Sequence, residues 1–193
     1  MTALINSPRC PSARRLLPGE REHMEYFHVV CAEEFSIFFE LPSWKDVILQ
    51  VTLAEPTLHH AALAIGALNR SRYHPDRQIP HVVAFSIRHY NMAIRYLHRR
   101  LDRSSQSLEL AVLASVVFSF IEFLLGLDSQ AEMHLQAGCA MLGSLYKKND
   151  RTMAHSCPAG PKQRVGSSSA NCDLLTNAMF QLTAQFDSLR QFS

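Results

Sequence analysis

The sequence predicts an all-α protein: a helical bundle, or an array of antiparallel helix pairs, around a buried apolar helix at residues 108–127. This segment carries no charge between Glu109 and Glu122, and its apolar residues cover every side of a helix, which requires burial. Elsewhere apolar residues recur at steps of three and four, the spacing of amphipathic helices. No segment alternates apolar and polar residues in the way that a half-buried strand does.

A transmembrane span is the alternative interpretation of residues 108–127. The charge-free run is shorter than the roughly 18 to 20 residues that a bilayer requires, and acids flank it. Ser107 can cap the helix, Glu109 suits its positive first turn, and Gly126 followed by Asp128 ends it. We therefore expect a core helix of a protein that does not insert into a membrane.

Length and charge narrow the class of protein. A chain of 193 residues fits one domain and buries about 70% of its unfolded surface without disulfides. The net charge of +2 and the pI of about 8.3 favour neither nucleic acid nor an anionic membrane as partner. The cysteines are odd in number and lack a C-x-x-C pair, as expected of reduced intracellular thiols: Cys10, Cys31, Cys139, Cys157 and Cys172. We expect Cys31 and Cys139 to be small core residues.

Residues 1–19 predict a disordered tail, because they are rich in Arg, Ser and Pro and contain no acid. The next segment, through Phe39, predicts a helix. Its apolar residues share one face: Met24, Phe27, Cys31, Phe35 and Phe38. Ser43 with Asp46 resembles a capping box for a short helix through Val51. In it Trp44 is interpreted as a packing anchor, with a ligand contact as the alternative.

Pro56 opens a helix that extends to Tyr73. Within it, Gly66 belongs to a row of small residues that lets another backbone approach closely. His59 and His60 point about 100° apart on a helix, a poor arrangement for chelating one metal. We expect both to be ordinary surface or boundary histidines.

The segment after Pro80 predicts the longest periodic helix. A helix-packing seam is expected from its apolar residues: Val83, Ile87, Tyr90, Ile94, Leu97 and Leu101. Arginines occupy its other sides: Arg88, Arg95, Arg99, Arg100 and Arg103. They could contact phosphate, but few aromatic residues interleave them, so a solvated face is the preferred interpretation.

After the apolar helix, Ser129 and Glu132 suggest a second capping box, and Lys147 and Lys148 suit a helix C-terminus. The seam of this helix is formed by Ala131, Leu135, Gly138, Leu142 and Leu145. Residues 20–148 thus form the predicted helical domain. Residues 149–172 predict a flexible linker. Asp173 caps a last helix, 173–193, whose apolar face docks on the bundle through Leu175, Met179, Leu182, Phe186 and Leu189.

No catalytic motif accompanies these helices. The sequence lacks a nucleotide-binding glycine loop, a metalloprotease motif, a nucleophile elbow and an EF-hand loop. His23 and His28 fall on different helix faces, and Cys139 has no adjacent base to activate its thiol. We therefore predict that the chain is not an enzyme and has no catalytic, cofactor-binding or metal-binding residues.

The order of particular residues resembles the middle region of fungal binuclear zinc cluster transcription factors. Residues 44–68 are similar to its W..VL and P.L.HA..A.GAL motifs. Tyr90, Ala93 and Leu97 look like its Y..A...L helix, residues 118–138 like its F.E...G....A..HL..G stretch, and residues 180–191 faintly like its F..L..Q helix. The resemblance spans about residues 20–145.

The resemblance implies a helical regulatory domain that restrains or licenses transcriptional activation, in the nucleus, with a metabolic gene cluster as a candidate target. It implies protein partners in the transcription machinery or a homo-oligomer, and a small-molecule effector in some members. The family's six-cysteine zinc cluster begins C-x2-C-x6-C, and the five cysteines here cannot build it. A truncated regulator, a fragment of a longer gene product and a free-standing paralogue stay open, as does an interaction scaffold with no DNA-linked role.

Overall fold

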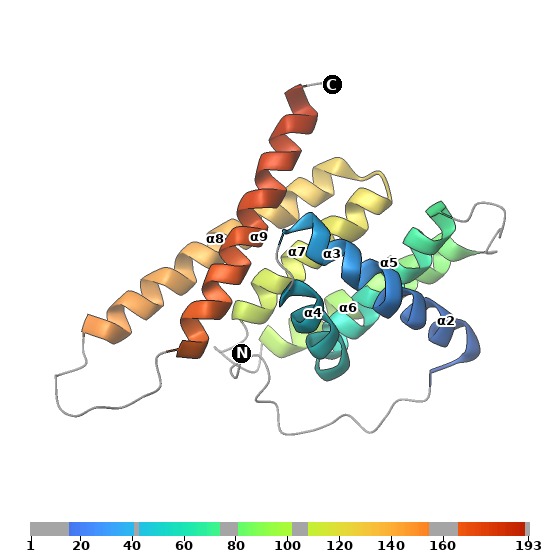
Figure 1. Ribbon diagram of the computed structural model, residues 1–193, viewed down its shortest axis with the longest axis horizontal. Coiled ribbons are helices and arrows are strands. Elements are labelled where there is room, and N and C mark those ends of the chain that lie inside the picture. The colour runs from blue at the N-terminus through green and yellow to red at the C-terminus, as the bar shows by residue number, and fades with distance from the viewer. Residues whose placement is uncertain (1–15, 41–42, 74–80, 102–107, 155–165, 192–193) are drawn as a thin grey trace.

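The computed structural model describes residues 16–40, 43–73, 81–101, 108–154 and 166–191, without the side chains of 148–154, 166–172, 186 and 189–191. Helices and the short turns that connect them make up these residues. The elements are α2 (Pro18–Tyr26), the π-helical turn η1 (Phe27–Cys31), α3 (Ala32–Phe38), α4 (Ser43–Ala54), α5 (Pro56–Tyr73), α6 (Val82–Leu101), α7 (Leu108–Leu124), α8 (Asp128–Ala154) and α9 (Gly166–Gln191). The predicted all-α fold is confirmed. Figure 1 shows α7 between the pair α8–α9 and the group formed by α2 to α6.

Two helices share the centre of the bundle. The predicted core helix is confirmed as α7, in which Val112 and Val116 are buried, and the backbone turns at Gly126 with φ of 73°. Helix α5 is buried over almost the same length, from Thr57 to Asn69, and packs against α2, α4, α6 and α7. Its alanines and glycine allow this burial, because small side chains admit helices on every side.

The N-terminal helix contains a π turn that the apolar periodicity did not predict. Met24, Phe27, Cys31 and Phe35 are buried as expected, but Phe39 completes the face, while Phe38 is only partly buried. One extra residue per turn in η1 rotates the rest of the helix, so the buried positions continue at four-residue spacing. Phe39 then contacts Trp44, with ring centroids 4.8 Å apart. Trp44 is fully buried, which confirms its packing role.

Two glycines mark the closest helix contacts. A Cβ atom at Gly66 would lie 2.2 Å from the carbonyl oxygen of His23, so α2 rests directly on α5. At Gly138 of α8 it would lie 2.2 Å from Ser115 Oγ of α7 and 2.7 Å from Met179 Cε of α9. The expected role of Gly66 in close packing is confirmed.

The predicted seam of α6 is wrong at its ends. Tyr90 is buried and Ile94 and Leu97 are partly buried, but Val83, Ile87 and Leu101 are exposed. The buried residues of α6 are instead Ser86, His89, Tyr90 and Ala93. The buried face is rotated from the apolar stripe because small and polar side chains fit against the broad surface of α5, and Ser86 Oγ donates a hydrogen bond to Ala64 O.

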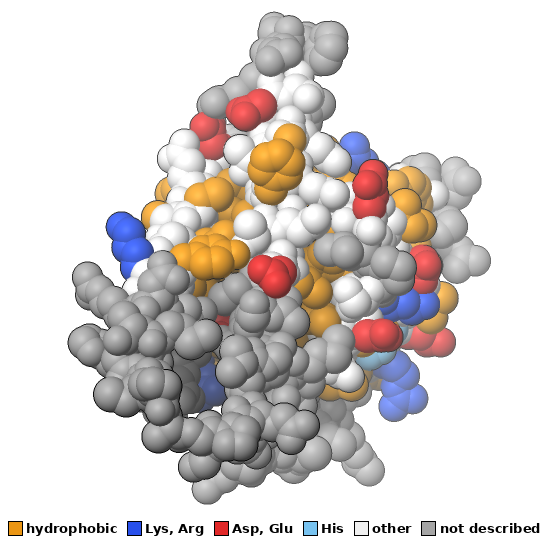
Figure 2. All heavy atoms as spheres, turned by 60° about the vertical axis from the view of Figure 1, so that its left-hand side comes forward, with side chains coloured by type: hydrophobic (Ala, Val, Ile, Leu, Met, Phe, Trp, Pro, Cys, Tyr) orange, Lys and Arg blue, Asp and Glu red, His pale blue; other side chains and the backbone are white. Residues whose placement is uncertain are grey.

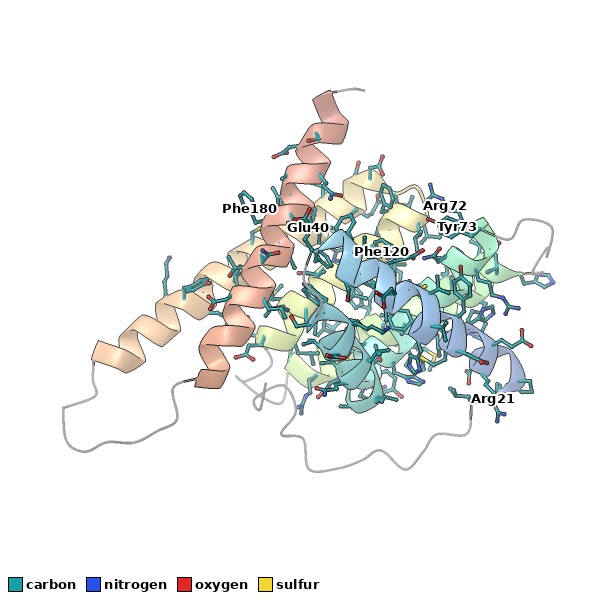
Figure 3. The ribbon with its side chains drawn as sticks, viewed as in Figure 1. Arg21, Glu40, Arg72, Tyr73, Phe120 and Phe180 are labelled. Carbon is teal, nitrogen blue, oxygen red and sulfur yellow. The ribbon has the colours of Figure 1, made fainter. Side chains whose placement is uncertain are left out.

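Helices α8 and α9 extend into both ends of the segment predicted as linker, 149–172. Since α8 continues to Ala154, Lys147 and Lys148 do not end it, and α9 begins at Gly166 rather than at Asp173. Residues 155–165 and the predicted tail 1–15 lie outside the described residues. The buried face of α9 includes Leu175, Ala178, Met179 and Leu182; the side chains of Phe186 and Leu189 are not described. Phe180 points away from the bundle (Figure 3).

Other local predictions also change. Cys31 is buried as expected, but Cys139 is exposed, because it follows the contact residue Gly138 by one position and so points about 100° away from the seam. Ser43 and Ser129 lie inside the first turns of α4 and α8 rather than before them. The first turn of α4 is instead capped from α3, since Lys45 N–H donates to Ser36 Oγ at 2.9 Å. Ser107 lies outside the described residues.

The surface over α8 and α9 mixes side-chain types. Figure 2 shows hydrophobic side chains there in patches separated by polar and acidic ones. No helix in the part of the chain that the structure describes combines the length and apolar character needed to cross a membrane. The expectation of a core helix rather than a span at α7 agrees with that result.

Candidate functional site

A tyrosine, a carboxylate and a histidine meet where α6, α7 and α8 come together. The tyrosine cluster is Tyr90 of α6, Glu122 of α7 and His134 of α8. Tyr90 Oη donates to Glu122 Oε1 at 2.7 Å and lies 2.8 Å from His134 Nε2. Because the hydroxyl proton goes to the carboxylate, Nε2 of His134 must carry the proton that it donates to the phenol oxygen. One hydroxyl therefore joins three helices.

Burial favours the neutral forms of Tyr90 and His134. Burial, followed by the hydrogen bond to Glu122 and its charge, raises the pKa of Tyr90 above its ordinary range. Burial lowers the pKa of His134, and the opposing attraction of Glu122 is the smaller effect. Glu122 Oε2 is buried and has no hydrogen-bond partner among the described residues. The cluster therefore depends on the Tyr90 hydroxyl to satisfy the carboxylate.

A second buried cluster lies on a neighbouring side of α6. The histidine cluster is His23 of α2, His60 of α5 and His89 of α6, with Glu20 of α2 at its edge. Nδ1 of His60 and Nδ1 of His89 are 3.0 Å apart, which requires one ring to donate and the other to accept. Glu20 Oε1 lies 3.7 Å from His89 Nε2. The ring of Phe85 separates His23 from His89, at centroid distances of 4.8 Å and 4.3 Å.

Burial disfavours the charged form of these histidines. It lowers the pKa of His89 to about 4, with Arg88, His59 and His23 acting in the same direction and Glu20 against them. Burial also lowers the pKa of His23, helped by Arg70. His23 Nδ1 and His89 Nε2 are buried without hydrogen-bond partners among the described residues. At neutral pH the rings of His23 and His89 are therefore uncharged in a low-dielectric interior.

The two clusters are linked by adjacent residues, because His89 and Tyr90 project to different sides of α6. His89 contacts residues of α2 and α5, and Tyr90 contacts residues of α7 and α8. A displacement of α6 would therefore break both sets of contacts at once.

The Tyr90 hydroxyl is engaged by Glu122 and His134, and the Nδ1 atoms of His60 and His89 are engaged with each other. The thiol of Cys31 is buried, which raises its pKa to about 12, and it accepts a hydrogen bond from Asn69 Nδ2 at 3.4 Å. A thiol in that state is a poor nucleophile. Among the described residues, no group of three His, Cys, Asp or Glu side chains is placed to hold a metal ion.

No functional residue was predicted from the sequence. The structure shows which features of the sequence could have indicated one. Glu122 lies in the last turn of an otherwise apolar core helix, a position that demands a buried partner. His60 was expected at the surface or boundary, yet it is buried, because the same helix is buried on nearly every side. Of the arginines on α6, Arg88, Arg95, Arg99 and Arg100 are exposed, and Arg103 lies outside the described residues.

The helices and the buried polar groups that join them define an all-α helical bundle. The family model of the fungal specific transcription factor domain matches residues 22–193. The chain therefore belongs to this family, and its role is in the regulation of transcription. No curated protein and no solved structure is found to match it.

The residues of the tyrosine cluster belong to the motifs in which this chain resembles the family. Tyr90 stands in one of the sequence motifs on which the resemblance rests, and Glu122 and His134 stand in another. The structure brings them together at one junction. The alternative of a scaffold unrelated to transcription is set aside by the family match.

Proposed function

We propose that this chain is the regulatory module of a fungal transcription regulator, acting in the nucleus on a metabolic gene cluster and catalysing no reaction. The observation that carries the proposal is the hydrogen-bonded junction of α6, α7 and α8, formed by residues of the motifs shared with the family. Such a junction can set the position of α6 relative to α7 and α8. Its output would be a change in the contacts made with proteins of the transcription machinery.

DNA contact is expected to come from a separate zinc cluster. The five cysteines of the chain do not show the C-x2-C-x6-C spacing. Of the two whose side chains the structure describes, Cys31 is buried and Cys139 is exposed. The purified chain should therefore show no sequence-specific binding in gel-shift assays with promoter fragments. Retention of a defined sequence by the chain alone would place a DNA-binding surface on it.

A reporter assay tests the regulatory role. The full chain is inserted between a heterologous DNA-binding domain and an activation segment, and reporter transcription is measured in a fungal host on several carbon and nitrogen sources. We expect an output that differs from that of the same fusion without the chain. Tyr90→Phe should move the output toward that of the fusion without the chain, because Glu122 loses its partner.

The control in this assay is Tyr146→Phe, which removes an exposed hydroxyl that lies 2.7 Å from Thr176 Oγ1. Immunoblots establish that all fusions accumulate equally, and a fluorescent fusion of the chain reports whether it enters the nucleus. Identical reporter output with and without the chain under every condition would refute a regulatory role. A small-molecule effector is a further expectation, tested by thermal shift against a metabolite panel, since a ligand selective for the folded state raises Tm.

A further inference from the structure

The N-terminal helix, α2 to α3, exposes one side to solvent. The acidic face on this side consists of Glu25, Val29, Glu33 and Ile37, all of which are exposed. Each of them lies two residues after a buried residue, and so about 160° away from it around the helix. Because the π turn η1 has more residues per turn than an α-helix, the four-residue spacing stays on one side. Arg21 and Glu40 mark the two ends of this helix in Figure 3.

The acidic face combines apolar side chains with negative charge. Ile37 and Val29 are 69% and 68% exposed, more than any other isoleucine, valine or leucine that the structure describes. Residues 22–40 contain five glutamates and no lysine or arginine. Glu33 pairs with Lys45 at 2.6 Å, an exposed contact that solvent weakens. The face is therefore unfavourable for nucleic acid or an anionic membrane, and it fits a positively charged segment with apolar side chains.

A positively charged segment precedes this helix in the same chain. Residues 1–15 contain three arginines and no acid, and they include the adjacent aliphatic residues Leu4 and Ile5. Pro8 and Pro11 favour an extended backbone, because proline fixes φ and restrains the residue before it. In charge and in apolar content, residues 1–15 therefore complement the acidic face.

The start of α2 fixes where residues 1–15 join the bundle. Leu16 packs against the core, directly before the N-cap residue Leu17. At 1.5 Å per helical residue, Glu25, Glu33 and Ile37 lie about 12 Å, 24 Å and 30 Å along the helix from this N-cap. These are the distances that a segment lying along the face has to cover.

Residues 1–15 carry their charged and apolar side chains at matching distances. In an extended chain at about 3.3 Å per residue, Arg14, Arg9 and Ile5 lie up to about 10 Å, 26 Å and 40 Å from the N-cap. If the segment turns back along α2 and α3, its arginines reach the two glutamates and its aliphatic residue reaches the far end of the face. The order of charged and apolar residues is thus the same on both sides.

We propose that residues 1–15 bind in extended form along the acidic face of the same chain. Tethering gives this segment an effective concentration of roughly 1 mM, so a contact with a Kd of about 1 mM is formed in about half of the molecules. Another protein can then reach the acidic face only by displacing residues 1–15, which makes the contact a point of control. Three pairings define the arrangement: Arg14 with Glu25, Arg9 with Glu33, and Ile5 with Ile37.

Paramagnetic relaxation enhancement tests the proposal in the full chain. A nitroxide label on Cys10 broadens the amide signals of the residues that it approaches, and even a contact formed part of the time is detected. Cys31 stays in place, because its thiol is buried and reacts poorly. We expect broadening at residues 29–37, and it should decrease as added salt screens the charges. Three substitutions remove the other thiols: Cys139→Ser, Cys157→Ser and Cys172→Ser.

Charge reversal on either side should abolish the contact. Arg9→Glu with Arg14→Glu reverses the segment. Glu25→Arg with Glu33→Arg reverses the face. Each pair should reduce the enhancement at residues 29–37 at least roughly threefold, because like charges then oppose each other. The four substitutions together should restore it, since opposite charges again face each other.

Asp173→Arg with Asp187→Arg serves as the matched control, because it makes the same change in net charge as the reversed face at exposed positions of α9. It should leave the enhancement as in the parent chain, and circular dichroism of each variant reports that the fold is kept. Absence of broadening at residues 29–37 would overturn the proposal. So would broadening that either reversed pair retains, or that the four substitutions together do not restore.

A mixture of two forms of the chain separates contacts within one molecule from contacts between molecules. One form carries the nitroxide label without isotope enrichment, and the other is isotope-enriched without the label. The mixture should show no broadening at residues 29–37, because each segment covers the face of its own chain. Broadening in the mixture equal to that in the labelled, enriched chain would place the covering segment in a second molecule and overturn the proposal.

Discussion

The hydroxyl of Tyr90 illustrates how a single polar atom can hold several helices in place. It is hydrogen-bonded to Glu122 and His134. Without this hydroxyl, Glu122 Oε1 would lose the hydrogen bond that it accepts, and Oε2 has no hydrogen-bond partner among the described residues. A buried acceptor left without a donor costs more than the hydrogen bond itself contributes. The Tyr90 hydroxyl therefore affects both the stability of the fold and the position of α6.

Tyr90→Phe is expected to lower the free energy of unfolding by about 1 to 3 kcal/mol, because it leaves Glu122 unsatisfied while keeping the ring. Urea denaturation at neutral pH, followed by circular dichroism, measures the change. Tyr146→Phe is the comparison, since its hydroxyl contact with Thr176 is exposed, and it should cost less than about 1 kcal/mol. If the two substitutions changed the free energy of unfolding equally, the tyrosine cluster would contribute no more to stability than an exposed hydrogen bond does.

At the scale of the helices, the contacts depend on where side chains are small. The approach of α2 to α5 requires that Gly66 lack a Cβ atom, because His23 O occupies that space. Gly143 of α8 is also helical, but nothing lies within 4 Å of its Cβ position. Glycine therefore has a packing role at position 66 and none at position 143.

Gly66→Ala should destabilise the fold by roughly 1 to 3 kcal/mol or more, because the clash is with backbone and α2 must move. Gly143→Ala should stabilise it by up to about 1 kcal/mol, since alanine is the better helix former. Thermal denaturation of both variants beside the parent chain measures the two signs. If Gly66→Ala raised Tm as Gly143→Ala is expected to do, α2 would not rest on α5 as described.

On the scale of the whole molecule, the histidine cluster makes stability depend on pH. The pKa of His89 is about 4 in the folded chain against 6.5 for an exposed histidine. Above pH 6.5 the ring is neutral in both states, and its contribution to stability is complete. Between pH 6.5 and 4 the unfolded chain binds a proton that the folded chain does not, so stability falls by up to about 3 kcal/mol.

His89→Gln should flatten this pH dependence. Because it also changes the contact with His60, its effect is judged from the difference between two pH values and not from the stability at pH 7 alone. The comparison is between unfolding free energies measured by urea at pH 7.5 and at pH 4.5. His98→Gln, at an exposed position of the same helix, should leave the pH dependence as in the parent chain. A His89→Gln chain as acid-sensitive as the parent would place the effect elsewhere.

Apolar spacing determined which segments are helical and which helix must be buried. The all-round apolar character of residues 108–127 specified a core helix, and Pro56 and Gly126 marked helix ends, because these signals are local in the chain. The family resemblance was likewise readable from the order of residues. None of these inferences needs to know which helices touch.

Tertiary structure alone decided which side of each helix is buried and which polar groups meet. The π turn at residues 27–31 exchanged Phe38 for Phe39, and α6 buried His89 and Ala93 while exposing Val83 and Ile87. Tyr90, Glu122 and His134 lie on three helices, and no spacing along the chain relates them. Their meeting follows from how whole helices pack, which depends on the summed shape of distant surfaces rather than on any one segment.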